Sequence, residues 1–126
     1  MSELRANTIS AANGTGPVTL TKQSAAKAWA SFDADASGTP VFDSFGTSSI
    51  TDNDTGIYIL NFSSSMANDD YAVTAGNSGN SGNACAFTTN YNTHTTSATG
   101  VKCIRTDNQS RVDCEVANMV IHGDLA

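Results

Sequence analysis

The sequence contains few charged residues and very few basic ones. Only 14% of its 126 residues are charged, and six Lys and Arg stand against twelve Asp and Glu, so the formal net charge is −6. The basic residues are scattered from Arg5 to Arg111 and form no cluster. Because nucleic acids and anionic membrane surfaces are bound by clustered positive charge, this composition argues against both as partners.

Long apolar runs are also missing. No stretch approaches the roughly 20 apolar residues of a membrane-spanning helix. The first ten residues, MSELRANTIS, lack the apolar core of a signal peptide. We therefore expect a soluble protein that does not associate with membranes and is not exported by the usual route.

Cysteine and histidine occur too rarely, and too far apart, to form a recognisable site. Cys85, Cys103 and Cys114 are an odd number without CxxC spacing, so we expect free thiols of a reducing cytoplasm, although one pair could still bridge. His94 and His122 lack the spacing of a zinc helix, and His94 is expected to be solvated. Phosphate-binding loops, dinucleotide fingerprints and serine nucleophile elbows are absent. We expect no enzyme activity, no cofactor and no metal.

Thr, Ser, Asn and Gly are abundant. The first three bond their own backbone and Gly costs entropy in a helix, so this composition disfavours helices and favours strands joined by tight turns. Short strands at near-regular spacing predict an all-β fold, an antiparallel β-sandwich of jelly-roll-like type. We expect one domain over residues 25–126, preceded by an extended N-terminal arm over residues 1–24.

The pattern of apolar residues predicts where the strands lie. The expected strands are 41–45, 48–52, 57–62, 71–75, 85–91, 100–106 and 111–123. Strand 57–62, IYILNF, is apolar on both faces, so we expect burial on two sides, the second side being a candidate subunit contact. In the last strand we expect Val112, Cys114 and Val116 to face inward, and Asp113 and Glu115 to face outward.

The predicted arm has too few apolar residues for a core of its own. Its apolar positions are Leu4, Ile9, Val18 and Leu20, on either side of the turn cluster 13–17. In VTLT (residues 18–21) apolar residues alternate with a period of two, so Val18 and Leu20 share one face. The arm therefore needs a partner surface, either on its own domain or on another chain.

The stretch FDADASGTPVFDSF (32–45) looks like an EF-hand calcium loop. Asp33, Asp35 and Gly38 match the first ligand, the third ligand and the turn glycine of such a loop. The twelfth position should be a bidentate acid but is Ser44, and the flanks have the pattern of strands. We therefore predict a hairpin turn, in which Gly38 supplies a positive φ.

Two further acidic turns accompany this hairpin. DNDTG (52–56) repeats the alternation of Asp with other residues before a glycine, and Asp69 and Asp70 are adjacent. Neither turn alone has the spacing of a known metal site. The three acidic turns could still converge on a cation in the folded chain, an alternative that the sequence leaves open.

One ordered run of residues resembles a known domain. The matching residues are Ala26 to Trp29, Asp43 to Phe45, Ser48 to Asn53, Gly56, Tyr58, Asn61, Phe62, Met66, Asp70 and Tyr71. This run, over residues 26–75, is similar to a domain near the ends of many bacteriophage tail fibre proteins, notably of aquatic phages. The resemblance implies an all-β, sandwich-like and trimeric knob, with a strand at 26–32, where Ala and Lys alone would favour a helix.

The first residues also resemble the N-terminal segments of such fibre proteins, which are associated with attachment to the virion and with trimer assembly. The resemblance implies a non-enzymatic virion protein, assembled in the bacterial cytoplasm as a homotrimer and bound to other virion proteins through the arm. Its polar loops suit hydrogen bonding to a host surface glycan. The candidate contact residues are Asn77, Asn80, Asn83, Tyr91, Asn92 and His94. Because tail fibres are usually longer, a capsid or tail decoration protein that stabilises the particle is the alternative.

Overall fold

The computed structural model describes residues 25–80 and 82–126, without the side chains of Asn90 and Tyr91. The predicted arm, with Leu4, Ile9, Val18 and Leu20, lies outside the described residues. The elements are β1 (Ala28–Asp33), β2 (Val41–Phe45), β3 (Thr47–Asp54), β4 (Ile57–Phe62), β5 (Ala72–Asn77), β6 (Cys85–Asn90), the 3-10 turn η1 (Tyr91–Thr93), β7 (Ala98–Arg105) and β8 (Val116–His122). Within this part of the chain, no helix is long and apolar enough to cross a membrane.

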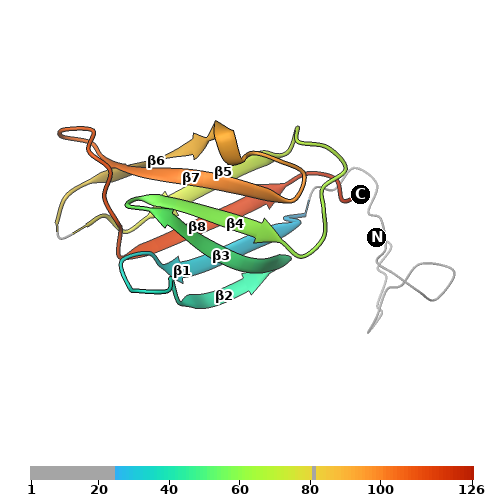
Figure 1. The fold of residues 1–126 in the computed structure, drawn as a ribbon, viewed down its shortest axis with the longest axis horizontal. Helices are drawn as coiled ribbons and strands as arrows, with labels where there is room; N and C mark the ends of the chain where they lie inside the picture. The colour runs from blue at the N-terminus through green and yellow to red at the C-terminus, as the bar shows by residue number, and fades with distance from the viewer. Residues whose placement is uncertain (1–24, 81) are drawn as a thin grey trace, which may run out of the picture.

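The strands form two antiparallel four-stranded sheets that pack face to face (Figure 1). One sheet has the strand order β2-β1-β8-β5 and the other has the order β3-β4-β7-β6. Hairpins join β1 to β2, β3 to β4 and β6 to β7, and the remaining connections pass from one sheet to the other. The predicted antiparallel β-sandwich is confirmed.

The connections between strands gather at two opposite ends of the sandwich. We call the end where β1 begins the entry end, and the opposite end the loop end. The entry end holds the connections 63–71 and 91–97 and the last residues, 123–126, and the loop end holds 34–40, 55–56, 78–84 and 106–115. In Figure 1 the C-terminus marks the entry end on the right, and the loop end is on the left.

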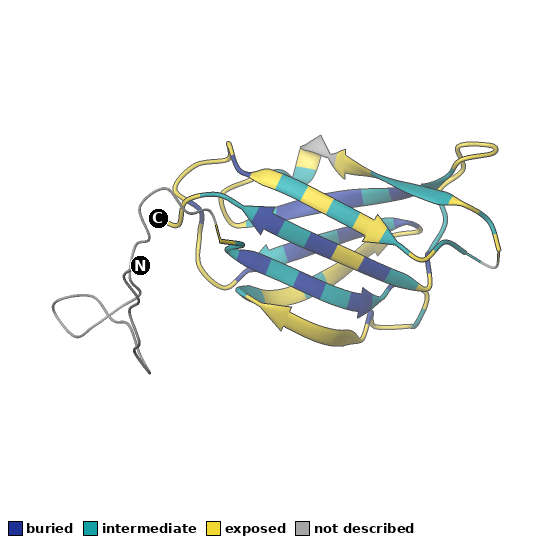
Figure 2. Ribbon diagram, turned by 180° about the vertical axis from the view of Figure 1, so that it is seen from behind, coloured by how far each residue is buried: buried dark blue, intermediate teal, exposed yellow. Residues whose placement is uncertain are grey.

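Alternating residues of the central strands build the core. The inward residues of β1 and β4 are Ala28, Ala30, Phe32, Tyr58, Leu60 and Phe62, all buried. The rings of Phe32 and Tyr58 meet edge to face at 5.5 Å between centroids and so join the two sheets. The outer face of β4, with Ile57 and Ile59, is half-buried in the single chain, and Figure 2 shows this alternation as bands along the strands.

The hairpin predicted for residues 32–45 is confirmed. β1 and β2 pair antiparallel, and between them the Asp33 carboxylate accepts hydrogen bonds from the amides of Asp35 at 3.1 Å and Ala36 at 3.0 Å. Gly38 has a φ of 83°, the left-handed conformation that glycine adopts without strain. The acidic side chain therefore closes the turn by capping backbone donors.

The prediction for the segment before β8 is wrong at two positions. Asp113, predicted to face outward, turns its carboxylate inward and accepts hydrogen bonds from the Tyr58 hydroxyl and the Gly56 amide, both at 2.7 Å. Val116, predicted to face inward, is half-buried, and Ala117 faces the core instead. The reason is that the ladder of β8 starts only at Val116, so the alternation of the preceding segment does not continue into the strand.

Gly56 lies in the tight turn between β3 and β4 and could not be replaced without a shift of the backbone. Its φ is 68°, and a Cβ at this position would lie 2.7 Å from the Cys103 carbonyl oxygen and 2.9 Å from the Val112 nitrogen. Its carbonyl accepts a hydrogen bond from the Cys103 amide at 2.7 Å. The turn thus packs backbone against backbone, which only glycine permits.

β2 is an edge strand that exposes large apolar side chains. Phe42 and Phe45 are each 59% exposed and Val41 is 44% exposed, and Figure 2 shows this strand in yellow along one side of the sandwich. Phe45 pairs with Trp29 of β1, which pairs in turn with Val120 of β8, so the three lie side by side on the outer face of the sheet. We call these five residues the apolar edge. Exposed edges of this kind are sites where other chains pair.

The three cysteines lie close to one another in the core. Cys103 and Cys114 are fully buried, Cys85 is half-buried, and all three are free thiols. Burial raises the pKa of the Cys114 thiol to about 11, and burial together with the neighbouring thiols raises the pKa of the Cys103 thiol still further above its ordinary value. Both buried thiols therefore stay protonated near neutral pH.

We expect a thiol reagent to distinguish the cysteines. At pH 8 one thiol per chain, that of Cys85, should react with Ellman's reagent within minutes, because only this side chain is partly accessible. Cys103 and Cys114 should react only after unfolding in urea. Rapid reaction of all three thiols in the folded protein would contradict the burial described above.

Substituting Tyr58→Phe should lower the free energy of unfolding by about 1–3 kcal/mol, measured by urea denaturation. The change removes the hydroxyl that lies 2.8 Å from the Ala34 carbonyl and 2.7 Å from the Asp113 carboxylate, both inside the protein. Asp52→Asn, in the exposed strand β3, is the control and should change stability by less than about 0.5 kcal/mol. Equal effects of the two substitutions would argue against a structural role for the hydroxyl.

Candidate functional site: the polar loop end

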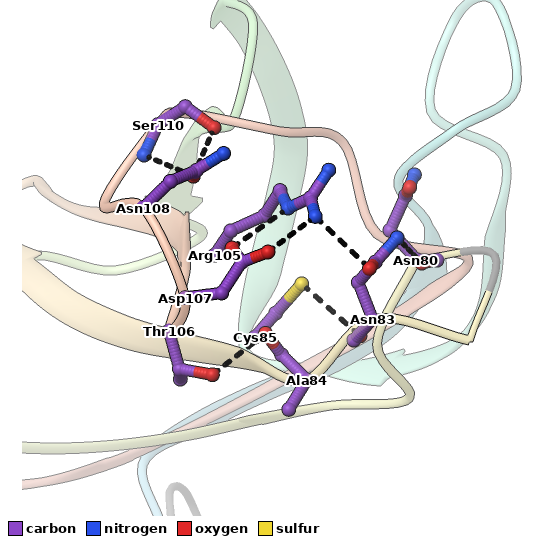
Figure 3. Close-up of polar contacts among 9 residues, drawn as sticks. All are labelled: Asn80, Asn83, Ala84, Cys85, Arg105, Thr106, Asp107, Asn108 and Ser110. Atoms are coloured by element: carbon purple, nitrogen blue, oxygen red, sulfur yellow. Dashed lines mark hydrogen bonds and ion pairs between the residues drawn. The ribbon is translucent and has the colours of Figure 1, made fainter.

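The loop end carries a polar cluster centred on Arg105. This residue closes β7, so its side chain reaches the connections at that end. Its Nε donates to Asp107 Oδ1 at 3.0 Å, and its Nη2 donates to Asp107 Oδ2 at 2.5 Å and to Asn83 Oδ1 at 3.0 Å (Figure 3). Such a two-pronged pair fixes the plane of the guanidinium group. With side-chain exposures of 28% for Arg105 and 57% for Asp107, the pair is accessible to a ligand.

The turn 106–110 holds Asp107 in place. The Arg105 amide donates to the Ser110 carbonyl at 2.9 Å, and the Gln109 amide donates to the Arg105 carbonyl at 3.0 Å. The Asn108 side-chain oxygen accepts from the Ser110 amide at 3.0 Å and from its hydroxyl at 2.7 Å. This closed turn is the sequence DNQS, which predicts a turn between two strands, although β7 and β8 belong to different sheets.

The loop 78–84 is attached to the same cluster by its asparagines. The Asn80 and Asn83 backbones pair with each other, and the Asn83 side chain also donates to the Asn80 carbonyl at 3.1 Å. The Asn80 side chain donates to the Asp113 carbonyl at 2.5 Å. Thr106 adds a bond from its hydroxyl to the Ala84 carbonyl at 3.2 Å. The loop is therefore linked to both the turn 106–110 and the segment before β8.

A second arginine-carboxylate pair lies at the same end. Arg111 Nη1 donates to Asp54 Oδ2 at 2.6 Å, and both side chains are about half exposed. The hydrogen bond from Arg111 holds the pKa of Asp54 below its ordinary value, as the bond from Arg105 does for Asp107. Both carboxylates therefore stay ionised to unusually low pH, and each arginine keeps its orientation.

The predicted contact residues in the first polar loop lie at the loop end, but their side chains are engaged within the protein. The Asn77 side-chain oxygen accepts from the Gly79 amide at 3.0 Å, and Asn80 and Asn83 make the bonds given above. These three side chains therefore hold the loop 78–84 in its conformation. The groups they leave accessible are those of Arg105 and Asp107, which the sequence prediction did not include.

The predicted contact residues in the second loop lie at the opposite, entry end. Asn92 is exposed, and the side chain of Tyr91 lies outside the described residues. His94, predicted to be solvated, is half-buried: its Nε2 lies 2.8 Å from the Asp69 carbonyl oxygen and its Nδ1 lies 3.1 Å from the Thr99 hydroxyl. The two predicted loops therefore do not form one contact surface.

His94 borders a small pocket at the entry end. Its ring lies 4.2 Å from that of Tyr71 between centroids, and Val73 and Thr89 complete the lining of a pocket of about 220 Å³. The Tyr71 hydroxyl is committed to the carbonyls of Thr95 and Ala98, and both nitrogens of His94 are committed to their own partners. With a volume below the roughly 300 Å³ at which ligand pockets usually begin, this site is the weaker candidate.

The three acidic turns do not meet. The turns 33–38 and 52–56 lie at the loop end, whereas Asp69 and Asp70 lie at the entry end. Two of their carboxylates are engaged in hydrogen bonds within the protein. Asp33 caps its own turn and Asp54 binds Arg111. Among the residues that the structure describes, no three His, Cys, Asp or Glu side chains are grouped to hold a metal ion.

The chemistry offered by the loop end is hydrogen bonding to a polar ligand. A guanidinium group held by a carboxylate presents donors beside acceptors, an arrangement that suits neighbouring hydroxyl groups. Sequence reasoning missed this pair because Arg105 and Asp107 are separated only by Thr106 in an ordinary turn. The available signal was the R-x-D spacing, whose Asp107 is also the first residue of DNQS, and this spacing is too common to be specific.

Asn83→Ala should loosen the loop end without unfolding the protein. The substitution removes the bond to Arg105 and the bond to the Asn80 carbonyl, so the amides of residues 78–84 should exchange with deuterium at least about tenfold faster. Asn80→Ala, which frees the Asp113 carbonyl, should have the same effect. Asn68→Ala at the entry end is the control and should leave the exchange of residues 78–84 unchanged. An equal increase of this exchange in the control would refute the specific role of the cluster.

The ion pair between Arg105 and Asp107 should be lost at low pH, when the carboxylate is protonated. Since the pKa of Asp107 is lowered in the folded state, its contribution is present above the ordinary aspartate pKa of 3.8 and is lost as the pH falls through the lowered value. Hydrogen exchange in residues 106–110, normalised for its intrinsic pH dependence, should therefore stay constant from pH 7 to 5 and rise below about pH 3.8. Asp107→Asn should remove this pH dependence; a midpoint near pH 6 would contradict it.

Comparison with known proteins adds no family to these observations. Neither the protein-family models, nor the curated proteins, nor the solved structures contain a match to this chain.

Proposed function

We propose that this chain is a non-enzymatic structural protein of a bacteriophage particle, of the tail fibre type. In this proposal the N-terminal arm attaches it to other virion proteins, and three copies assemble into a homotrimer. The loop end then faces the host cell and makes contact with a polar surface ligand such as a glycan. The protein is assembled in the bacterial cytoplasm and acts as part of the virion.

The observation that carries this proposal is the division of the sandwich into two unlike ends. The chain enters at one end, where Ala25 follows the arm and the apolar edge begins, and Arg105 with its polar loops lies at the other end. A domain held by its entry end presents the opposite end outward. Arginine, carboxylate and amide groups at that outward end suit recognition of hydroxyl-rich ligands.

The resemblance to tail fibre domains supports the proposal through residues that build the framework. Trp29 pairs with Phe45 across β1 and β2, and the Asn61 side chain bonds to Ser49 and Thr51 across β3 and β4. The other matching aromatic residues, Tyr58, Phe62 and Tyr71, lie in the core. These positions determine the shape of the knob, so the resemblance bears on fold and assembly, whereas the loops that would touch a host lie outside it.

A decoration protein on the capsid or tail is the second candidate. The observation that favours it is the apolar edge, because exposed phenylalanines along one side of a small domain suit docking on a protein shell. In that case the side of the sandwich, rather than the entry end alone, would contact the particle. The density of the knob in a reconstruction of the virion separates the two candidates.

Mass photometry of the purified full chain tests the assembly. The 13.0 kDa chain is fused to a larger carrier protein of known mass so that the particle is heavy enough to detect, and we expect a species of three times the mass of the fusion. The carrier alone, a known monomer, is the control. A monomer at micromolar concentration, together with single copies in the virion, would refute the trimer.

Competition for adsorption tests the host contact. Purified protein incubated with host cells should reduce adsorption of the phage severalfold, because it occupies the same surface ligand. The variant Arg105→Ala with Asp107→Ala should compete at least about tenfold less well, since its paired donors and acceptors are lost. Asn92→Ala at the entry end should compete like the unmodified protein, and competition that is unchanged by the loop-end substitutions would refute this site.

A further inference from the structure

The strand β2, which forms the outer part of the apolar edge, has no cover among the described residues. All five residues of β2 are exposed, so the strand presents backbone donors and acceptors along its free side together with the rings of Phe42 and Phe45. Natural edge strands are usually kept from pairing by lysines, prolines or a covering segment, and β2 carries a single charged residue, Asp43. An edge of this kind is built to receive another strand.

The chain itself supplies a segment of suitable length and pattern. The residues before Ala25 connect to β1 at Ala28, directly beside the end of β2, because Trp29 is paired with Phe45. Within them, VTLT (18–21) alternates apolar and polar residues, which places Val18 and Leu20 on one face of a strand. Residues 22–27 can span about 20 Å when extended, so the connection is long enough for VTLT to lie beyond the β1 of its own chain.

Charge favours the same segment. Residues 1–24 contain Glu3, Arg5 and Lys22 and so carry a net charge of +1. Since the whole chain carries −6, residues 25–126 carry −7. Lys22 follows VTLT directly, and Asp43 stands exposed in the middle of β2. A basic arm and an acidic sandwich attract each other, and this attraction directs encounter and register more than it adds affinity.

We propose that residues 18–21 of a neighbouring copy add as an antiparallel strand to the free edge of β2, with Val18 and Leu20 packed beside Phe45. A strand from the same chain would have to run parallel to β2, because it leads into β1 at the end where β2 finishes. It would also have to cross the connection through Gly46 that leaves β2 there. Connections that cross at the same end of a sheet are disfavoured.

This exchange of arms explains how copies could form a closed assembly. Each copy gives its arm to one neighbour and receives the arm of another, which is a head-to-tail contact that forms a ring when the rotation closes. The inference rests on the proposed homotrimer and specifies the contact that holds it together. It also accounts for the apolar residues of the arm that have no core of their own.

Photo-crosslinking of the full chain tests the contact directly. Phe45 is replaced by p-benzoylphenylalanine, the protein is irradiated, and tryptic peptides are identified by mass spectrometry. We expect a product of twice the chain mass in denaturing gels, linked to the peptide 6–22, which trypsin releases after Arg5 and Lys22. The same group at Asp52 on β3 is the control and should give no such link. A monomer-sized product, a link between two β2 strands, or no link at Phe45 would each overturn the proposal.

A charge placed on either face of the arm provides the second measurement. Val18→Asp with Leu20→Asp should raise the dissociation constant of the trimer at least about tenfold, because two apolar contacts are lost. Thr19→Asp with Thr21→Asp adds the same charge to the opposite face and should change it by less than about threefold. Equal effects of the two pairs would overturn the proposal while leaving the trimer intact. A monomeric unmodified chain would instead refute the trimer and the arm exchange together.

Discussion

The buried hydroxyl group of Tyr58 links parts of both sheets of the fold. The side chain is fully buried in β4, and its hydroxyl lies between the Ala34 carbonyl at the end of β1 and the Asp113 carboxylate before β8. Burial, followed by the bond to Asp113, raises the pKa of Tyr58 far above its ordinary value, so it remains a hydrogen-bond donor at any relevant pH. One proton is thus shared by acceptors that belong to different parts of the sandwich.

The polar loop end is attached to this interaction. Asp113 receives the Tyr58 hydroxyl and the Gly56 amide with its carboxylate, and its carbonyl receives the side chain of Asn80. Asn80 pairs with Asn83, which in turn binds Arg105. A continuous series of hydrogen bonds therefore leads from the core to the exposed guanidinium group. The surface that we propose for ligand contact is held by the same group that joins the two sheets.

The sequence predicted the framework well because the framework follows local rules. Alternation in IYILNF predicted that Tyr58, Leu60 and Phe62 share a face, and they do so in the core. Asp33 and Gly38 predicted the hairpin, because positive φ and side-chain capping are local properties. Strand order and the pairing of β1 with β8 could not be predicted in this way, since these partners lie far apart in the chain.

The site could be predicted only in part, because its bonds join residues distant in sequence. Polar loops were expected on either side of the predicted strand 85–91, but nothing local indicated that Asn80 and Asn83 would be bound to distant parts of the protein. Asp113 was expected to face outward because its neighbours alternate, and the partner that turns it inward, Tyr58, is 55 residues away. The Arg105 side chain is likewise held by a hydrogen bond to Asn83, which lies 22 residues earlier in the chain.

In the proposed orientation the entry end faces the particle and the loop end faces outward. A reconstruction of the virion by electron cryo-microscopy, with the sandwich fitted into the density, measures this orientation directly. We expect three knobs around one axis, with the N-terminal ends of β1 toward the particle and the Arg105 loops at the tip. Knobs with the Arg105 loops buried against the particle, or with the entry end outermost, would contradict it.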